Sequence, residues 1–339
     1  MKESRVPELD LLKGLGIIMM IIGHMHINET VLNHWIYAFH MPLFFIVSGI
    51  LHKKTELKTI TRKRAKTLLI PYLSFGGGYW LIFNFLLLVR KGDTSQIIPT
   101  LMTLLFFPTE GIVLESSLWF LPIMYITVIV YCLLDNILER KGVLSLITLL
   151  IGFTGFILPR FMKQRLPLGL ESVMVALLFY HTGRLMRDFK ITERTGIYKR
   201  KRKAVFYIFY IIITCLNTYL IFMNGTVNMR LARWGNPILM LVNAVTTTTL
   251  LLILCNYAVK RAGDSFVSSL LKRISTCSIV YICANHLVIR ISRFVVLKVF
   301  NNSLLYIISV FCLSIILLYS LGELFFRTRL KIFVGKINS

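Results

Sequence analysis

The chain has 339 residues, of which 56% are hydrophobic, and a mean hydropathy of +0.73. Apolar runs of about twenty residues alternate with short polar breaks, which is typical of a polytopic helical membrane protein and excludes a soluble domain. A net charge of +24 would suggest nucleic acid as a partner of a soluble protein. Here it is interpreted as a topology signal, with membrane lipids rather than nucleic acid as the partner of the basic residues.

The hydropathy pattern predicts an all-α membrane bundle of about ten transmembrane helices. The apolar segment 97–107 is too short to span and is typical of an interfacial or re-entrant piece. An odd number of spans is left open. We expect residues 1–339 to form a single transmembrane domain with no soluble domain. In chain order the predicted spans are 10–28, 35–52, 67–89, 118–138, 143–161, 170–186, 204–224, 237–258, 275–298 and 303–325.

The distribution of basic residues predicts the orientation of this bundle. With an even number of spans, both termini lie on one side. Placing that side in the cytoplasm puts 27 of the 39 Lys and Arg residues in the inner loops and tails. Because inner loops carry an excess of Lys and Arg, the sequence predicts an N-in, C-in topology.

The first two predicted spans contain three ionisable residues, Lys13, His24 and His40. Such residues are costly in hydrocarbon and indicate a functional site by default. Lys13 and His24 are eleven positions apart, which puts them on one helical stripe roughly 16 Å apart. His40 lies at a similar depth in the next helix, so we expect the two imidazoles to lie level across a hairpin. Alternatively, each histidine is an interhelical hydrogen-bonding residue, and Lys13 snorkels to the headgroups.

A small pair, Ser48 and Gly49, lies lower on the second predicted helix. Small residues let another helix approach closely. They would equally admit a narrow ligand such as a pantetheine arm, and the sequence leaves both interpretations open. The six cysteines fall inside predicted spans with no metal-ligand spacing, so we expect them to be packing residues and expect no metal site.

Five motifs follow one another along the chain. They are Lys13 followed by ten residues and His24, FHMPLFFIVSG at 39–49, RKRAKTLLIPY at 62–72, LWFLP at 118–122, and YICANH ending at His286. In this order they resemble those of the acyltransferase type 3 family, most closely its branch of fucose 4-O-acetylase-like and exopolysaccharide O-acetyltransferases. The first 72 residues are the most specific part. Many members have Arg at the position of Lys13, and many carry an additional hydrolase-like domain, for which we expect no counterpart in this sequence.

The resemblance implies an enzyme of the bacterial cell membrane that transfers an acyl group, usually acetyl from cytoplasmic acetyl-CoA, to a glycan or lipid-linked saccharide at the outer face. It implies no permanently bound cofactor. The attacking sugar hydroxyl must lose a proton, and imidazole has a suitable pKa. We assign His24 as this base. With His40 at the same depth, the sequence permits either direct attack or a relay through an acylated histidine.

The donor carries phosphates, for which basic residues are the expected ligands. Arg62, Arg64 and Lys66 lie in a predicted cytoplasmic loop, where the alternative is a purely topological role. Lys13 and Arg184 lie in the inner thirds of their predicted helices. They would meet the pyrophosphate or polarise the thioester carbonyl, although Arg184 could instead snorkel.

Two candidate acceptor residues, Glu115 and Trp119, lie at the predicted outer mouth, and a third, His286, lies within the ninth predicted span and faces either the bundle or its outer exit. Glu115 could orient an imidazole or bind the acceptor, or it could be an exposed loop residue. Trp119 could stack on a sugar ring or belong to an interfacial aromatic belt. His286 could bind substrate or be a structural hydrogen-bond partner. We expect acceptor specificity to reside in the outer loops near 90–117, 162–170 and 225–236.

Two rival functions fit the same intramembrane charges. In a secondary transporter or flippase, Lys13, His24 and His40 would form a proton or substrate relay. That function favours inverted repeats and paired broken helices, and the sequence shows neither. In a membrane scaffold or sensor for polysaccharide export, the intramembrane charges would be dispensable.

Overall fold

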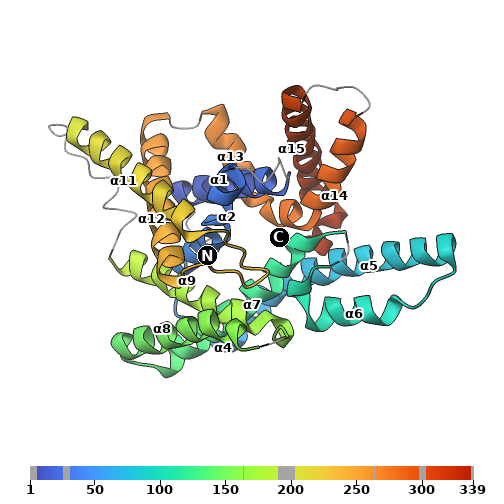
Figure 1. The fold of residues 1–339 in the computed structure, drawn as a ribbon, viewed down its shortest axis with the longest axis horizontal. Helices are drawn as coiled ribbons and strands as arrows, with labels where there is room; N and C mark the ends of the chain where they lie inside the picture. The colour runs from blue at the N-terminus through green and yellow to red at the C-terminus, as the bar shows by residue number, and fades with distance from the viewer. Residues whose placement is uncertain are drawn as a thin grey trace. The chain divides into compact units, whose positions relative to one another are not determined.

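The computed structural model contains helices connected by short turns. Within the residues it describes there is no β-strand, which confirms the prediction of an all-α protein (Figure 1). The described residues are 6–25, 31–112, 114–162, 164–189, 203–262, 265–297 and 303–336.

The chain folds into two compact units, here named unit 1 and unit 2. The prediction of one transmembrane domain over 1–339 stays a prediction. Unit 1 comprises Met1–Lys53, Ala176–Met229 and Arg233–Thr276, and unit 2 comprises Lys54–Val175, Arg230–Ala232 and Cys277–Ser339.

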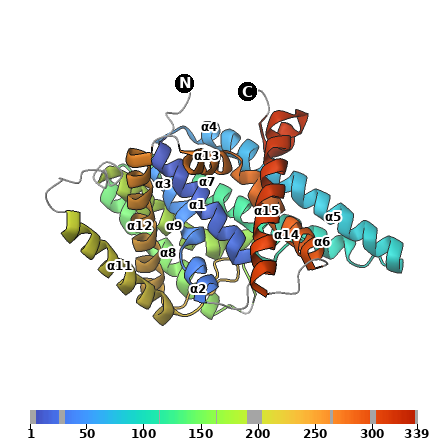
Figure 2. The same cartoon turned by 90° about the horizontal axis from the view of Figure 1, so that it is seen from above.

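Unit 1 is organised around its first helix, which contacts at least four other helices of the unit. The helix begins at Pro7, a position where a missing N–H is tolerated, and Glu8 and Asp10 lie in its first turn, where they complement the helix dipole. The last helix of the unit packs across it (Figure 2). The helices are α1 (Pro7–His24), α2 (Val31–Tyr37), α3 (His40–Ile50), the later part of α9 (Leu170–Asp188), α11 (Lys203–Asn224), α12 (Pro237–Ala262) and α13 (Phe266–Thr276).

Helices α3 and α9 approach closely within unit 1 through two glycines. A methyl group added at Gly49 would collide with the carbonyl oxygen of Tyr180, and one added at Gly183 would collide with that of Ile46. Each glycine therefore faces the backbone of the opposite helix. The small residue at position 49 accommodates another helix here, as the first of the two sequence interpretations proposed.

Unit 2 contains the remaining long helices and several 3₁₀ turns. Helices α14 and α15 lie side by side, and α6 is held against α5 by a hydrogen bond from Trp80 Nε1 to the Ile97 carbonyl, 3.1 Å long (Figure 1). The helices are α4 (Leu57–Arg64), α5 (Ile70–Lys91), α6 (Ile97–Phe106), α7 (Phe120–Ile137), α8 (Lys141–Ile157), the start of α9, α14 (Ser278–Leu297) and α15 (Ser303–Arg327). The 3₁₀ turns are Pro108–Glu110, Ser116–Trp119, Leu158–Arg160, Pro167–Gly169 and Arg329–Val334.

Within the described residues each of the ten predicted spans contains helix, although turns at 38–39 and 277 interrupt the second and the ninth. Eight helical segments of the described chain are long and apolar enough to cross a membrane. The other two, α1 and α9, each carry at least three charged residues. The protein is thus a polytopic membrane protein, while the count of ten spans and their orientation stay predictions. The eight segments are Val31–Ile50, Leu57–Lys91, Ser116–Ile137, Lys141–Arg160, Val205–Asn224, Pro237–Arg261, Ser278–Leu297 and Leu304–Arg327.

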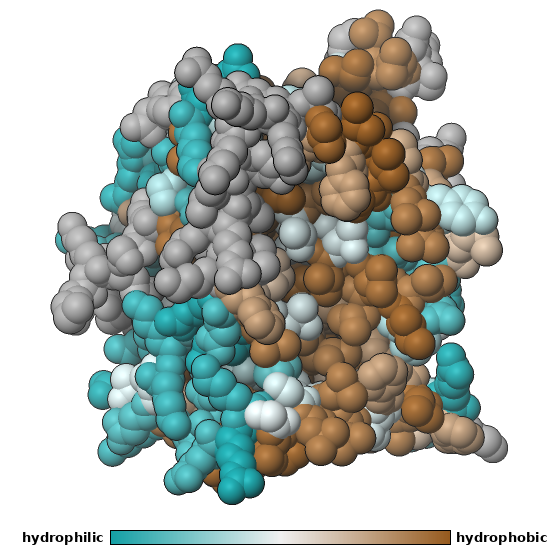
Figure 3. Space-filling model, turned by 90° about the vertical axis from the view of Figure 1, so that its left-hand side faces the viewer, coloured by the Kyte–Doolittle hydropathy of each residue, from teal (hydrophilic) through white to brown (hydrophobic). Residues whose placement is uncertain are grey.

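Large apolar side chains are exposed along these long helices, among them Phe85 on α5 and Phe209 on α11. Figure 3 shows apolar side chains spread broadly over one face of the protein, with hydrophilic side chains beside them. In water such a surface would be unfavourable, so it is a surface suited to lipid.

Candidate functional site

Two histidines and a tyrosine form a cluster in unit 1 where α1 ends and α3 begins. The ring centroids of His24 and His40 are 6.5 Å apart with the rings edge to face. The Tyr37 ring lies 6.5 Å from that of His24 and 5.0 Å from that of His40. The structure therefore brings together the two imidazoles that the helix geometry placed at one depth. Their roles stay predictions.

The orientation of His40 is fixed by the backbone. Its side chain is buried, with 3% of the residue exposed, and Nδ1 lies 2.9 Å from the carbonyl oxygen of Ile36. A carbonyl oxygen can only accept, so Nδ1 carries the hydrogen in this bond. In the neutral ring the lone pair then belongs to Nε2. Nε2 is therefore the ring atom of His40 that can accept a proton or another bond.

Lys13 lies in the same helix as His24 and forms an ion pair with Asp10, with 3.2 Å between Nζ and Oδ1. The Ser275 hydroxyl of α13 donates to the same carboxylate oxygen over 3.4 Å. The Lys13 side chain is 28% exposed. The Asp10 carboxylate therefore orients the ammonium group and partly balances its charge, while leaving part of it accessible.

Arg184 is anchored on its own helix by an ion pair with Asp188. One turn away, the Arg187 guanidinium donates to the carbonyl of His52. The His52 ring in turn lies against Tyr180, with 3.1 Å between Nδ1 and the phenol oxygen. Sequence reasoning missed His52, Tyr180 and Arg187. The signal available in the sequence was the position of Tyr180 and Arg187, which flank His181 and Arg184 within 180–187.

In unit 2, Glu115 is buried, with none of its surface exposed. Its Oε2 accepts the backbone N–H of His286 over 3.0 Å, and its Oε1 accepts that of Ser117 over 3.4 Å. Glu115 precedes the span Ser116–Ile137. Burial raises the pKa of its carboxyl to about 8, although the His286 and Ser117 N–H groups act to lower this pKa. The interpretation of Glu115 as an exposed loop residue is wrong. The residue fastens the 114–119 segment to α14.

Replacing Glu115 with alanine is expected to lower the apparent melting temperature, because the backbone N–H groups of His286 and Ser117 would lose their acceptor in a buried place. Each unsatisfied donor costs about 1–3 kcal/mol. The matched control is Glu110→Ala, whose side chain is exposed. The measurement is thermal unfolding in detergent followed by size-exclusion chromatography. Equal melting temperatures for the two variants would contradict the anchoring role.

The segment fastened by Glu115 presents a serine to His286. The Ser116 hydroxyl oxygen lies 3.0 Å from His286 Nε2, and the neighbouring Ser117 hydroxyl bonds to the Asn285 side chain. Trp119 is 5% exposed and packs against Phe120. Its burial excludes an exposed belt position, and its stacking on a sugar stays a prediction, as does substrate binding by Glu115 and His286.

The three basic residues predicted to meet the donor phosphates lie where α4 passes into a π-helical turn, Ala65–Leu69, in unit 2. Arg62 is exposed, whereas Arg64 and Lys66 are half-buried. The Nε atom of Arg64 is buried and has no hydrogen-bond partner among the described residues. A buried donor of this kind is suited to an anionic oxygen.

Within the described part of the chain, no group of three or more His, Cys, Asp or Glu side chains is arranged to hold a metal ion. The groups gathered in each unit are bases, hydroxyls and cations. They are suited to proton transfer and anion binding.

The chain is similar to known proteins over most of its length. A family model described as an acyltransferase domain matches residues 6–323. The nodulation protein NolL of Sinorhizobium fredii (strain NBRC 101917 / NGR234) is 40% identical over 85 residues, which are 21% of this chain and 23% of NolL. The match thus spans less than a quarter of that relative. No solved structure matches the chain.

Proposed function

Because the chain belongs to the acyltransferase type 3 family and is a membrane acyltransferase, we propose that it transfers an acyl group, acetyl in the first place, from cytoplasmic acyl-CoA to a glycan hydroxyl at the outer face of a bacterial cell membrane. The acceptor is a cell-surface or lipid-linked saccharide. The observation that carries this proposal is the His24 and His40 pair, whose rings lie 6.5 Å apart at the meeting of α1 and α3.

The reaction requires one base and a route for one proton. The acceptor oxygen attacks the thioester carbon while His24 takes the hydroxyl proton, forming a tetrahedral intermediate. When this intermediate collapses, the carbon–sulfur bond breaks and the CoA thiolate takes the proton from the imidazolium. In the alternative route, Nε2 of His40 first attacks the thioester carbon, the carbon–sulfur bond breaks and CoA leaves as the thiolate. The acceptor hydroxyl, losing its proton to His24, then attacks the acyl carbon, the bond to Nε2 breaks, and the proton passes from His24 to the thiolate.

The cations supply binding and electrostatic stabilisation. Lys13 would bind the CoA pyrophosphate rather than the reacting carbonyl, because it lies roughly 16 Å along α1 from His24, and Asp10 would hold its ammonium in place. In unit 2, Arg62, Arg64 and Lys66 would bind the CoA phosphates, and the buried, unpartnered Nε of Arg64 supports this assignment. Arg184 would contribute to donor binding from α9, after exchange of its Asp188 partner for a phosphate oxygen.

The decisive experiment uses the purified protein in liposomes, with radiolabelled acetyl-CoA outside or inside and an envelope glycan fraction as acceptor. Label transferred to glycan by the wild type, and lost in His24→Ala, supports the enzyme. Uptake of the acceptor without transfer supports a transporter. Transfer that survives in His24→Ala and Lys13→Ala rejects the proposed site.

Lys13→Ala is expected to lower kcat/KM for acetyl transfer by about 10- to 100-fold through weaker donor binding, because a hydrogen bond from a charged group contributes about 1.5–3 kcal/mol. Lys13→Arg should retain most activity because it keeps the charge and the ion pair with Asp10. The control is Lys91→Ala, a change at an exposed lysine at the end of α5. A Lys13→Ala variant as active as Lys91→Ala would exclude the electrostatic role.

A further inference from the structure

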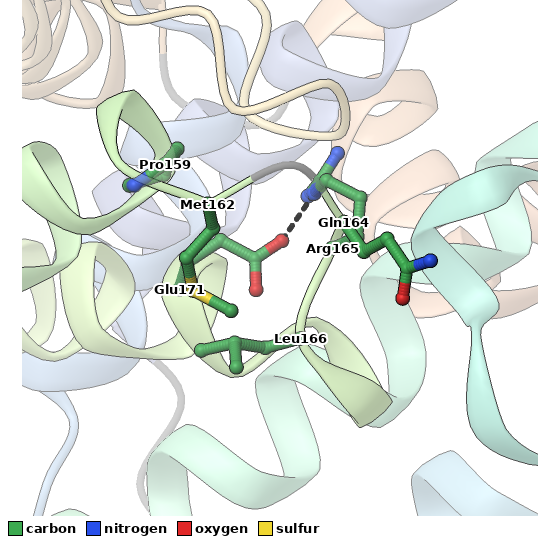
Figure 4. Close-up of a pocket in the computed structure, with 6 residues that line it drawn as sticks. All are labelled: Pro159, Met162, Gln164, Arg165, Leu166 and Glu171. Carbon is green, nitrogen blue, oxygen red and sulfur yellow. Dashed lines mark hydrogen bonds and ion pairs between the residues drawn. The ribbon is translucent and has the colours of Figure 1, made fainter.

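A pocket of about 80 Å³ opens in unit 2 beside the start of α9. This volume is several times the roughly 10–15 Å³ that one water molecule needs. Figure 4 shows the Glu171 carboxylate paired with Arg165 on one side, while Met162 and Leu166 form apolar walls. The pocket is lined by Pro159, Met162, Gln164, Arg165, Leu166 and Glu171.

The Arg165 guanidinium is fully engaged. Its Nε donates to Glu171 Oε1, one terminal nitrogen donates to the Arg230 carbonyl over 2.7 Å, and the other lies 3.4 Å from the Ser172 hydroxyl. Arg165 therefore has little capacity left for an anionic ligand. The positive charge of Arg165 also balances the negative charge of Glu171, so the pocket has no net charge that would attract a cation.

Glu171 contributes the group that lacks a partner. The residue is 2% exposed, and its second carboxylate oxygen, Oε2, is buried with no hydrogen-bond partner among the described residues. In Figure 4 this oxygen points away from Arg165, toward the Met162 and Leu166 side of the pocket. A buried carboxylate oxygen without a donor is costly, and a ligand O–H would satisfy it.

The walls of the pocket belong to a junction of loops that the sequence assigned to the outer side. Arg230 donates to the carbonyls of Thr109 and Glu110, each over 3.2 Å, and accepts from Arg165 through its own carbonyl. Gly169 packs against the Thr109 side chain. Parts of the three predicted specificity loops thus meet in unit 2, beside the segment that carries Glu115 and Ser116.

We propose that this pocket binds one sugar ring of the glycan acceptor, with a ring hydroxyl donating to Glu171 Oε2. A neutral ligand with hydroxyl donors along one edge and an apolar face matches an acceptor-only oxygen opposite Met162 and Leu166. Gln164 also lines the pocket, although its amide extends away from Glu171 in Figure 4. This inference rests on the proposed function, because it names the place where the same reaction holds its acceptor.

The test is direct binding, which needs no acyl transfer. Saturation-transfer NMR on the purified full chain in detergent uses methyl glycosides of glucose, fucose and N-acetylglucosamine as probes. Two variants alter the pocket independently. Glu171→Gln removes the acceptor charge, and Leu166→Trp fills the space while leaving the Arg165–Glu171 pair intact. The matched control is Glu139→Gln, an exposed glutamate of unit 2 outside the three predicted specificity loops.

At least one glycoside should give a signal with the wild type and with Glu139→Gln that falls at least fivefold in both pocket variants, each checked for folding by its melting temperature. No signal with the wild type, or a signal retained in either pocket variant, overturns the proposal and leaves the pocket to water. Glycan acylation is measured separately. Binding that depends on the pocket, without acylation by the wild type, would reject the proposed function and keep the sugar site.

Discussion

His24→Ala is expected to lower kcat for acyl transfer by about 10²–10⁴-fold, because the acceptor hydroxyl would lose its general base. Binding of acyl-CoA should change little, since the imidazole acts on the acceptor. Rates are measured at saturating donor and acceptor, with donor binding followed separately by equilibrium dialysis. The matched control is His34→Ala in α2 of the same unit, where the ring bonds the Gly225 carbonyl over 2.7 Å.

Replacement of His40 distinguishes the two reaction routes. His40→Asn keeps a side-chain N–H for the Ile36 carbonyl but has no basic nitrogen in place of Nε2. If an acyl-histidine forms, this variant should be inactive, and wild-type protein incubated with labelled acetyl-CoA without acceptor should carry the label on His40. With direct attack, His40→Asn should keep a substantial rate. A His24→Ala variant with the activity of His34→Ala would contradict both routes.

The helical order of this protein could be predicted because long apolar runs leave few alternatives in a membrane. The rise of about 1.5 Å per residue in a helix was likewise sufficient to predict that His24 and His40 lie at one depth, and the structure brings their rings together. The prediction was less complete at helix junctions. The break between α2 and α3, at residues 38–39, divides what the sequence indicated as one span.

The loop contacts could not be predicted in this way. The sequence left an exposed loop position open for Glu115. A buried carboxyl is costly, and here the compensation comes from the His286 N–H about 170 positions later, which no local pattern indicates. The bond between Arg165 and the Arg230 carbonyl likewise joins distant loops that have no periodicity. The pairing of His52 with Tyr180 depends on the approach of α3 to α9, which no local pattern at His52 indicated.

The close approach of α3 and α9 predicts a second large effect of mutation, on the stability of the protein. Gly49→Ala and Gly183→Ala are each expected to destabilise the protein by about 1–3 kcal/mol or more, because the added methyl group meets a backbone carbonyl oxygen that cannot move without separating the helices. Separation of the two helices would also break the contacts of the His52 ring with Tyr180 and of the Arg187 side chain with the His52 carbonyl, so we expect activity to fall together with stability. The measurement is the apparent melting temperature in detergent, together with acyl transfer by the protein that remains folded.

The controls are Gly77→Ala and Gly78→Ala in α5, where an added methyl group meets nothing within 4 Å. Alanine is favoured over glycine inside a helix by about 1 kcal/mol, so these two variants should be as stable as the wild type or more so. The same chemical change thus has opposite expected signs at the two places, and only the helix contact differs. If Gly49→Ala and Gly77→Ala melted at one temperature, α3 and α9 would not be held together by their glycines.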